Sequence, residues 1–329
     1  MSRAVNFVWN YCNDAQKHAV SWNKKWLSGF DLNYLTASSA KELKLNAQTI
    51  QAIGQQYAKS RMQHKKPWLK YRGKKQLGWV PLKGQSIRVD GDDFIFAGNV
   101  FRVFNSRPIP ENANIKDGTN FSRDNRGRWY LNVVVEAPDC PVKTGTESVG
   151  IDLGLKDFAV LSTGEKIEAP RIFRKYQACL GKLQRANKKR STKKIHDKIK
   201  NSRKDFHHKL STSLVNKYNT IFVGNVNSSK LVKTKMAKSV LDAGWSSFKT
   251  MLTYKSIRNG VNYLEVDEKF STQTCFVCGS LTGPKGLTGL NKRIWKCVEC
   301  NSTHDRDVNS AKNILGCGRA TLVEGIVLV

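Results

Sequence analysis

Four cysteines near the carboxyl end of the chain have the type and spacing of a metal site. Cys275 and Cys278 form one C-x2-C pair, and Cys297 and Cys300 form a second pair after a spacer of 18 residues. Each pair presents two thiolates from one tight turn, and four thiolates complete the tetrahedral shell of Zn²⁺. An iron–sulfur cluster and a redox dithiol pair are the alternatives, and the absence of a thioredoxin-like βαβ pattern around either pair disfavours redox chemistry. Because four thiolates close the shell, we expect this zinc to be structural.

Two aspartates stand where carboxylates can hold catalytic cations. Asp152 ends a β-rich run in GIDLG, and Asp307 opens a helical run in HDRDVNSAKNIL. Acids at a strand end and a helix start can converge on divalent ions, which activate water and stabilise the leaving oxygen of a phosphodiester. Taken singly, Asp152 also fits a turn residue and Asp307 a helix N-cap. Together, in a strongly basic chain, they favour a nuclease.

The net charge indicates a polyanionic partner. The 329 residues include 56 Lys or Arg and 26 Asp or Glu, which gives a formal net charge of +30. Such a surplus favours nucleic acid first and an anionic membrane surface second. No apolar run approaches the roughly 18 residues of a spanning helix, and Asn and Asp interrupt the N-terminal segment where a signal peptide needs an apolar core. We therefore expect a protein of the cytoplasm, or of the nucleus if the source is eukaryotic, without a membrane partner.

Basic side chains gather in two segments. In residues 64–75, HKKPWLKYRGKK, cations alternate with aromatic rings, which suits phosphate pairing and base stacking. Residues 171–210 hold 15 Lys or Arg and 2 acids with apolar residues at helical spacing, which predicts long basic helices. A solvated linker and a solvated helix face are the alternatives. Arg306, beside Asp307, is a further cation that can contact nucleic acid, and an internal ion pair is the alternative for it. We expect the following side chains to contact nucleic acid: Lys65, Lys66, Trp68, Lys70, Tyr71, Arg72, Lys188, Lys189, Arg190, Lys193, Lys194, Arg203 and Arg306.

The elements that must position these residues change in kind along the chain. Apolar residues at helical spacing come first, and then short β-rich runs such as SIRVD, DFIFA and WYLNVVVE predict a compact antiparallel barrel or sheet. Strands and helices alternate after a linker that follows. We expect a multidomain α+β protein with a helical region at 1–75, a β-barrel region at 76–140, an α/β domain at 148–270 with basic helices at 170–216, a zinc ribbon at 271–303, and a closing helix and tail at 304–329.

Several segments together resemble one known family. GIDLGLKDFAVLSTGE, NSRKDFHHKLS, KFSTQTCFVCGS and WKCVEC followed by HDRDVNSAKNIL resemble the TnpB proteins, transposon-encoded relatives of the type V CRISPR effectors. The resemblance implies a wedge-like β-barrel with an inserted recognition helix bundle, then an RNase H-like (RuvC) nuclease domain with an inserted four-cysteine zinc ribbon. It also implies a guide RNA from the transposon end and a Mg²⁺-dependent cut in matching double-stranded DNA. Gln273, just before the first cysteine pair, would contact nucleic acid or form a turn.

One acid of the family pattern is missing. The usual second acid is a Glu that ends the fourth strand, as in IVIEDLN, whereas this chain has IFVGNVN with Gly224 and Asn225 at that place. The next strand reads YLEVDEKF, and alternation puts Glu268, nearest its carboxyl end, on the same face as Val266. The carboxylates assigned to Mg²⁺ are therefore Asp152, Glu268 and Asp307, with Glu265 and then Asp242 as second choices. The alternative for Glu268 is an ordinary charged residue at a strand end.

Three functions fit these residues. The first is an RNA-guided, metal-dependent DNA endonuclease. The second is an RNA-guided DNA-binding protein without cleavage, acting like a repressor, which the missing Glu motivates. The third is an accessory factor whose zinc ribbon binds nucleic acid without a guide. Retention of Asp152 and Asp307 favours the endonuclease, and His304 is the histidine we would test for a role beside Asp307.

Overall fold

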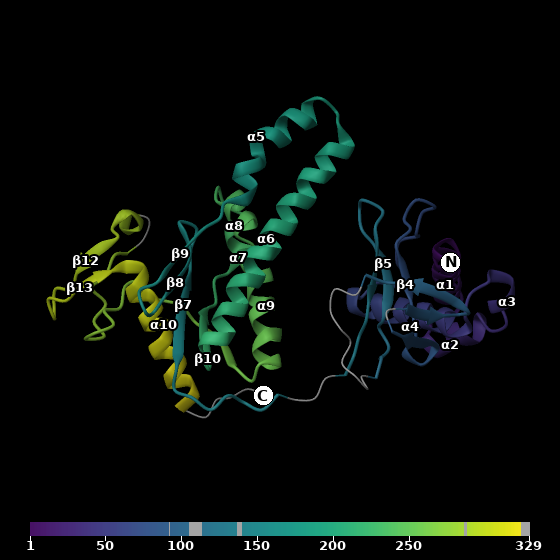
Figure 1. The fold of residues 1–329 in the computed structure, drawn as a ribbon, viewed down its shortest axis with the longest axis horizontal. Helices are drawn as coiled ribbons and strands as arrows, with labels where there is room; N and C mark the ends of the chain where they lie inside the picture. Colours follow the sequence, from purple (N-terminus) through teal and green to yellow (C-terminus); the bar gives the residue numbers. More distant parts are fainter. Residues whose placement is uncertain (92, 105–113, 137–139, 286–287, 324–329) are drawn as a thin grey trace. The chain divides into compact units, whose positions relative to one another are not determined.

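The computed structural model describes residues 1–91, 93–104, 114–136, 140–285 and 288–323. The chain folds as two compact units, Met1–Pro138 and Asp139–Val329 (Figure 1). Each unit has its own apolar core. In the described residues, no helix combines the length and apolar character needed to cross a membrane.

Four helices begin the first unit, in the region where the apolar spacing predicts helical structure. The bundle is held by apolar residues three or four apart, such as Val5, Val8 and Cys12 on the first helix, which pack against Ile53 and Tyr57 on the fourth. Asn46 caps the fourth helix by accepting a hydrogen bond from the next turn. The helices are α1 (Ser2–Asn23), α2 (Gly29–Leu35), α3 (Ala40–Leu43) and α4 (Ala47–His64).

Short strands complete the first unit, but the expected closed barrel is wrong for the described residues. They form two separate antiparallel sheets, in the orders β1-β5-β6 and β2-β3-β4. The physical reason is that Val80, Leu82 and Phe96 pack into the core of the helices, so the helices cover the apolar faces that a closed barrel would turn inward. The elements are β1 (Trp79–Pro81), η1 (Gly84–Ser86), β2 (Ile87–Asp90), β3 (Asp93–Phe96), β4 (Asn99–Arg102), β5 (Asn120–Arg123) and β6 (Trp129–Asn132).

A five-stranded mixed sheet forms the centre of the second unit. Its order is β11-β10-β7-β8-β9, with β7, β8 and β9 antiparallel and β10 parallel to both β7 and β11. Because parallel strands end at the same edge, Asp152, Gly224 and Val266 come to one edge of the sheet. The strands are β7 (Ser148–Leu153), β8 (Asp157–Leu161), β9 (Lys166–Glu168), β10 (Thr220–Gly224) and β11 (Asn262–Val266).

Helices cover the two faces of this sheet unequally. The odd-numbered residues of β7, such as Ile151, point into the main core with Leu214 of α6 and Phe248 of α9. The opposite face carries Gly150 and is covered by α10 (Figure 1). The helices are α5 (Ile172–Arg185), α6 (Lys189–Lys217), α7 (Ser228–Leu231), α8 (Ala237–Ala243), α9 (Trp245–Arg258) and α10 (Arg306–Val323).

Two details of the second unit differ from the sequence pattern. The pattern of residues 238–257 predicts one helix, but Gly244 adopts the left-handed conformation (φ 65°) and divides the segment into α8 and α9. The sequence after the cysteines predicts a short helix from about 306 to 315, whereas the closing helix continues to Val323. The cysteine ribbon between β11 and α10 contains η2 (Thr288–Asn291) and a two-stranded sheet of β12 (Ile294–Lys296) and β13 (Thr303–Asp305).

Candidate metal centres and nucleic-acid surface

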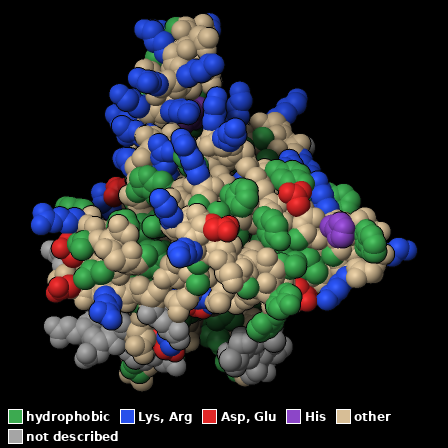
Figure 2. Space-filling model, turned by 90° about the vertical axis from the view of Figure 1, so that its right-hand side faces the viewer, with side chains coloured by type: hydrophobic (Ala, Val, Ile, Leu, Met, Phe, Trp, Pro, Cys, Tyr) green, Lys and Arg blue, Asp and Glu red, His purple; other side chains and the backbone are tan. Residues whose placement is uncertain are grey.

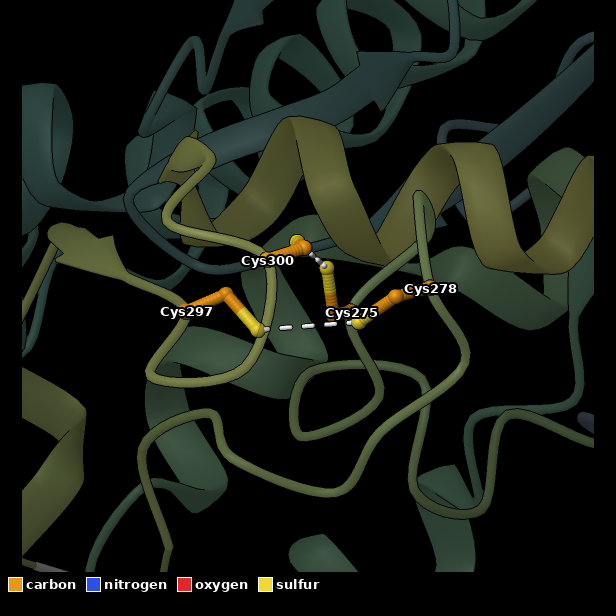
Figure 3. Close-up of side chains that lie close together, drawn as sticks. All are labelled: Cys275, Cys278, Cys297 and Cys300. Atoms are coloured by element: carbon orange, nitrogen blue, oxygen red, sulfur yellow. Dashed lines mark hydrogen bonds between the residues drawn. The ribbon is translucent and has the colours of Figure 1, made fainter.

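The four predicted cysteines converge in the ribbon. Their ligand atoms all lie within 4.8 Å of one another, and Figure 3 shows the sulfurs of the two pairs facing each other. The Sγ–Sγ distances are 3.6 Å between Cys275 and Cys300 and 3.7 Å between Cys278 and Cys297. A tetrahedral Zn²⁺ with Zn–S bonds of ~2.3 Å needs sulfurs ~3.8 Å apart. The residues therefore fit a metal such as zinc.

The two cysteine turns are built alike. Cys275 N–H donates to the carbonyl of Ser280 at 2.8 Å, and Cys297 N–H donates to that of Ser302 at 2.9 Å. Hydrogen bonds from the Ser280 and Thr282 hydroxyls lower the pKa of the Cys297 thiol, so the thiolate form is favoured there. Burial instead raises the pKa of the Cys275 thiol to about 11, so it is the backbone hydrogen bonds that hold both turns ready for a cation.

His304 belongs to the cysteine cluster. Its side chain is buried between Phe276 and Trp295, and its Nε2 lies 3.1 Å from Sγ of Cys275. At that distance an imidazole N–H can donate to a metal-bound thiolate. The structure thus places the histidine against Cys275, although it is only three residues from Asp307.

The three predicted carboxylates line one pocket at the carboxyl edge of the sheet. Asp152, Glu268 and Asp307 share a cavity of about 490 Å³ with Arg293 and Arg306. Burial, with the nearby charges of Asp307 and then Glu268, raises the pKa of Asp152 to about 7. The carboxylate oxygens of Asp152, Glu268 and Asp307 are not grouped as tightly as the ligand atoms of the four cysteines. A divalent cation would relieve the repulsion that raises this pKa, so the donor set fits a hard, oxygen-preferring ion.

Glu268 occupies the space that Gly224 leaves open. A Cβ atom built on Gly224 would lie 2.7 Å from Oε2 of Glu268 and 3.2 Å from Cδ1 of Ile314. Any side chain on Gly224 would therefore collide with this carboxylate. Burial is the main reason that the pKa of Glu268 is raised. The Glu268 carboxylate, which follows β11, thus lies beside the position on β10 where the family pattern has an acid.

The two second-choice acids lie elsewhere. Glu265 accepts a hydrogen bond from Lys249 of α9 at 2.6 Å, on the face of the sheet opposite Asp152. Asp242 accepts from the backbone N–H of Phe173 at the start of α5 and pairs with Arg203 at 3.0 Å. Each of these carboxylates is engaged in a contact that joins secondary-structure elements.

Two arginines hold Asp307. Arg306 donates to Oδ1 through Nη2 at 2.9 Å and through Nε at 3.1 Å, and Arg293 of the ribbon donates to Oδ2. The internal ion pair considered for Arg306 is therefore present. Sequence reasoning missed Arg293, and no local pattern pointed to it because the pair joins residues from two different elements.

Two asparagines fasten α10 to the ribbon. Asn309 and Asn313 both donate from Nδ2 to the carbonyls of Ser271 and Thr274, at 2.7–3.2 Å. Asn309 also accepts from the backbone N–H of Phe276 at 3.1 Å. These bonds fix the segment that leads into the first cysteine pair against the helix that carries Asp307. Their spacing of one helical turn is the signal that sequence reasoning could have used.

The predicted nucleic-acid residues occupy different settings. Lys188, Lys189 and Arg190 lie at the turn between α5 and α6, and Figure 2 shows Lys and Arg side chains gathered on the projecting end of this hairpin. Lys193 and Lys194, farther along α6, are also exposed.

In the first unit, Lys65, Lys66 and Lys70 are exposed, and the residues Trp68 and Tyr71 are each 45% exposed. Arg72 instead stacks on Trp9, with its guanidinium carbon 3.7 Å from the ring centroid. Arg203 and Gln273 of the second unit are the remaining residues, the first paired with an acid and the second in a turn.

Comparisons with known proteins agree on one group. The family described as "Cas12f1-like, TNB domain" matches residues 245–314, and the family described as "Probable transposase", OrfB of IS605, matches residues 132–235. A Streptomyces pristinaespiralis protein named "Putative RNA-guided DNA endonuclease" is 39% identical over 65% of this chain. An Escherichia coli K12 protein named "Putative RNA-guided DNA endonuclease InsQ" is 26% identical over 93% of it.

The relatives differ in length from this chain. The aligned part spans 56% of the Streptomyces protein and 81% of the E. coli protein. A solved structure described as a Cas12f1–sgRNA–target DNA complex aligns with a TM-score of 0.61 at 14% identity, covering 95% of this chain and 80% of that one. This last match shows a shared multidomain fold.

Proposed function

Because the chain belongs to the TnpB-like, IS605-type family, we propose that it is an RNA-guided DNA endonuclease. It would bind a guide RNA from a transposon end and hydrolyse phosphodiester bonds in matching double-stranded DNA. It would act at the bacterial nucleoid, since its proposed target is DNA. Base pairing would read the sequence, and the protein would read duplex shape and a short adjacent motif.

The observation that carries this proposal is the pocket formed by Asp152, Glu268 and Asp307. The sheet order β11-β10-β7-β8-β9, with three antiparallel strands followed by two parallel ones, fits an RNase H-like (RuvC) domain. Mg²⁺ held by these carboxylates would activate water and stabilise the leaving oxygen. The chain's own contribution is to bring the three acids from β7, the end of β11 and the start of α10 to one edge.

Glu268 is proposed as the replacement for the missing strand acid. Its carboxylate oxygen lies where a side chain of residue 224 would begin. It shares the face of Val266, which packs with Phe222 and Ile314 under α10. Glu265 is on the opposite face with Lys249, so it is a weaker candidate for the same role.

The cysteine cluster is proposed as a structural zinc site. All four sulfurs face one centre, which leaves no position for substrate. The exposed cations of the α5–α6 turn and of residues 65–70 are proposed to contact the guide RNA and the RNA–DNA duplex, because exposed Lys and Arg pair with phosphates irrespective of sequence.

The decisive experiment joins RNA identification with cleavage. The full chain, purified from cells that express its native locus, should carry a discrete RNA with a transposon-end boundary. With that RNA and Mg²⁺ it should cut matched duplex DNA, and Asp152→Asn should abolish cutting while retaining RNA. Asp205→Asn, which removes one negative charge from an exposed residue of α6 outside the pocket, controls for the loss of charge alone. Purified protein without a defined RNA would refute the guided function.

A second candidate is an RNA-guided DNA-binding protein without cleavage. The specific observation in its favour is that both oxygens of Asp307 are paired with arginines. Guide-dependent DNA binding, with intact DNA in both Mg²⁺ and Mn²⁺, would select this candidate over the nuclease.

A further inference from the structure

Arg293 occupies an unusual position for a ribbon residue. It directly precedes β12, and its carbonyl accepts a hydrogen bond from the backbone N–H of Arg306 at 2.7 Å. Its side chain lines the same pocket as Asp152 and Glu268. The guanidinium donates to Oδ2 of Asp307, and among the described residues this is its one hydrogen-bonding partner.

The two arginines on Asp307 differ in how firmly they are held. Arg306 makes two bonds to Oδ1 and a third to the carbonyl of Gly289 at 3.3 Å, and its side chain is 11% exposed. The Arg293 side chain is 36% exposed and is held by Asp307 alone among the described residues. Arg293 can therefore leave the carboxylate while Arg306 stays.

The Oδ2 atom is the oxygen that remains for a cation, since Arg306 takes Oδ1. A guanidinium and a divalent ion on the same oxygen compete for its lone pairs and repel each other through their positive charges. When the ion binds, the Arg293 fork is released at the rim of a pocket whose proposed substrate is an anionic phosphodiester. Guanidinium groups pair with phosphate oxygens through two parallel hydrogen bonds.

We propose that Arg293 exchanges partners during the reaction, pairing with Asp307 before the divalent ion binds and with a phosphate of the DNA strand afterwards. This inference rests on the proposed nuclease function. In its first state Arg293 holds Asp307 in place in the acidic pocket. In its second state it fixes the strand and offsets negative charge that develops on the phosphate.

The test uses the full chain with two readouts of opposite sign. Electron paramagnetic resonance measures the binding of Mn²⁺ alone to the RNA-free protein. The affinity for Mn²⁺ should be about tenfold higher in Arg293→Ala, because a competing charge-assisted hydrogen bond is gone. Asp152→Asn identifies the Mn²⁺ bound in this pocket. Single-turnover cleavage with guide RNA at saturating Mn²⁺ should slow by about 10- to 100-fold in the same Arg293→Ala variant.

Lys292→Ala is the matched control, since it removes an exposed cation from the adjacent position, and it should change neither readout appreciably. Weaker or unchanged Mn²⁺ binding in Arg293→Ala overturns the exchange, and so does full-rate cleavage. Arg293→Lys, which keeps the charge but loses the fork, should regain part of the cleavage rate. A wild-type chain that binds Mn²⁺ but never cuts refutes the proposed function instead, and the Mn²⁺ readout still decides whether Arg293 competes with the ion.

Discussion

Gly224→Ala tests whether Glu268 acts from the space beside β10. The new Cβ would lie 2.7 Å from Oε2 of Glu268. Ordinary contact begins near 3.4 Å, so the carboxylate must retreat by roughly 0.7 Å or adopt another rotamer. A misplacement of ~1 Å in an active site can cost ~100-fold in rate. We therefore expect cleavage to fall by about 10- to 100-fold, or ~1.4–2.7 kcal/mol in activation free energy.

The same substitution should leave the stability of the fold almost unchanged. Gly224 ends a strand with ordinary backbone angles, and alanine is favoured over glycine in a strand by ~0.5–1 kcal/mol. The contact with Cδ1 of Ile314 at 3.2 Å offsets part of this gain. The melting temperature should therefore move by no more than about 2 °C.

The assay is single-turnover cleavage of matched DNA by the RNA-loaded chain, with thermal unfolding measured in parallel. Glu268→Ala should lose at least as much rate as Gly224→Ala, and combining the two should cost little more than Glu268→Ala alone, because both act on one carboxylate. Full activity in Gly224→Ala would refute the placement of Glu268. Gly224→Glu introduced into Glu268→Gly should recover part of the rate by moving the acid back to β10.

Three further outcomes follow from the geometry. The pKa of Asp152 is raised from 3.8 to about 7 in the folded chain, so without divalent ions the folded chain holds a proton that the unfolded chain loses. The melting temperature should therefore fall as the pH rises from about 4 through about 7. Asp152→Asn should flatten this pH profile, and Mg²⁺ should counteract the fall. Elemental analysis should find one zinc per chain, lost in Cys297→Ser and kept in Cys179→Ser, whose thiol is exposed outside the cluster. In Gly318→Ala the new Cβ would lie 2.1 Å from Phe222, so the free energy of unfolding, measured by urea denaturation, should fall by about 1–3 kcal/mol. In Gly316→Ala the new Cβ meets nothing within 4 Å, so this control should be neutral or stabilising.

Local patterns predicted the parts of the site that short-range geometry controls. A C-x2-C pair is a single turn, so its two thiolates are placed by the backbone of four residues, and the cluster of Cys275 and Cys297 with their partners is confirmed. Strand alternation likewise predicts that Glu268 and Glu265 lie on opposite faces of the sheet, because the two acids differ by an odd number of residues along an extended chain.

Contacts between distant elements were beyond such patterns. The pair of Arg293 and Asp307 depends on how the ribbon folds back on α10, which no periodicity encodes. The barrel failed for a related reason, since strands with apolar residues such as Val80 and Phe96 can bury them against one another or against helices. The sequence of such strands is the same in either arrangement, so the neighbouring helical core determines which arrangement forms.

Helix α10 would make the two proposed metal centres mechanically dependent on each other. Asp307 is in its first turn, and farther along the same helix Asn309 and Asn313 donate to the carbonyl that precedes Cys275. Loss of zinc would free the ribbon from its thiolate cluster, so Arg293 would leave the neighbourhood of Asp307 with it. Chelation of zinc should therefore change Mn²⁺ binding in the acidic pocket, although the cysteines supply no ligand there. Because Asn309→Asp keeps the size of the side chain but removes its donor, it should reproduce part of this effect with zinc still bound.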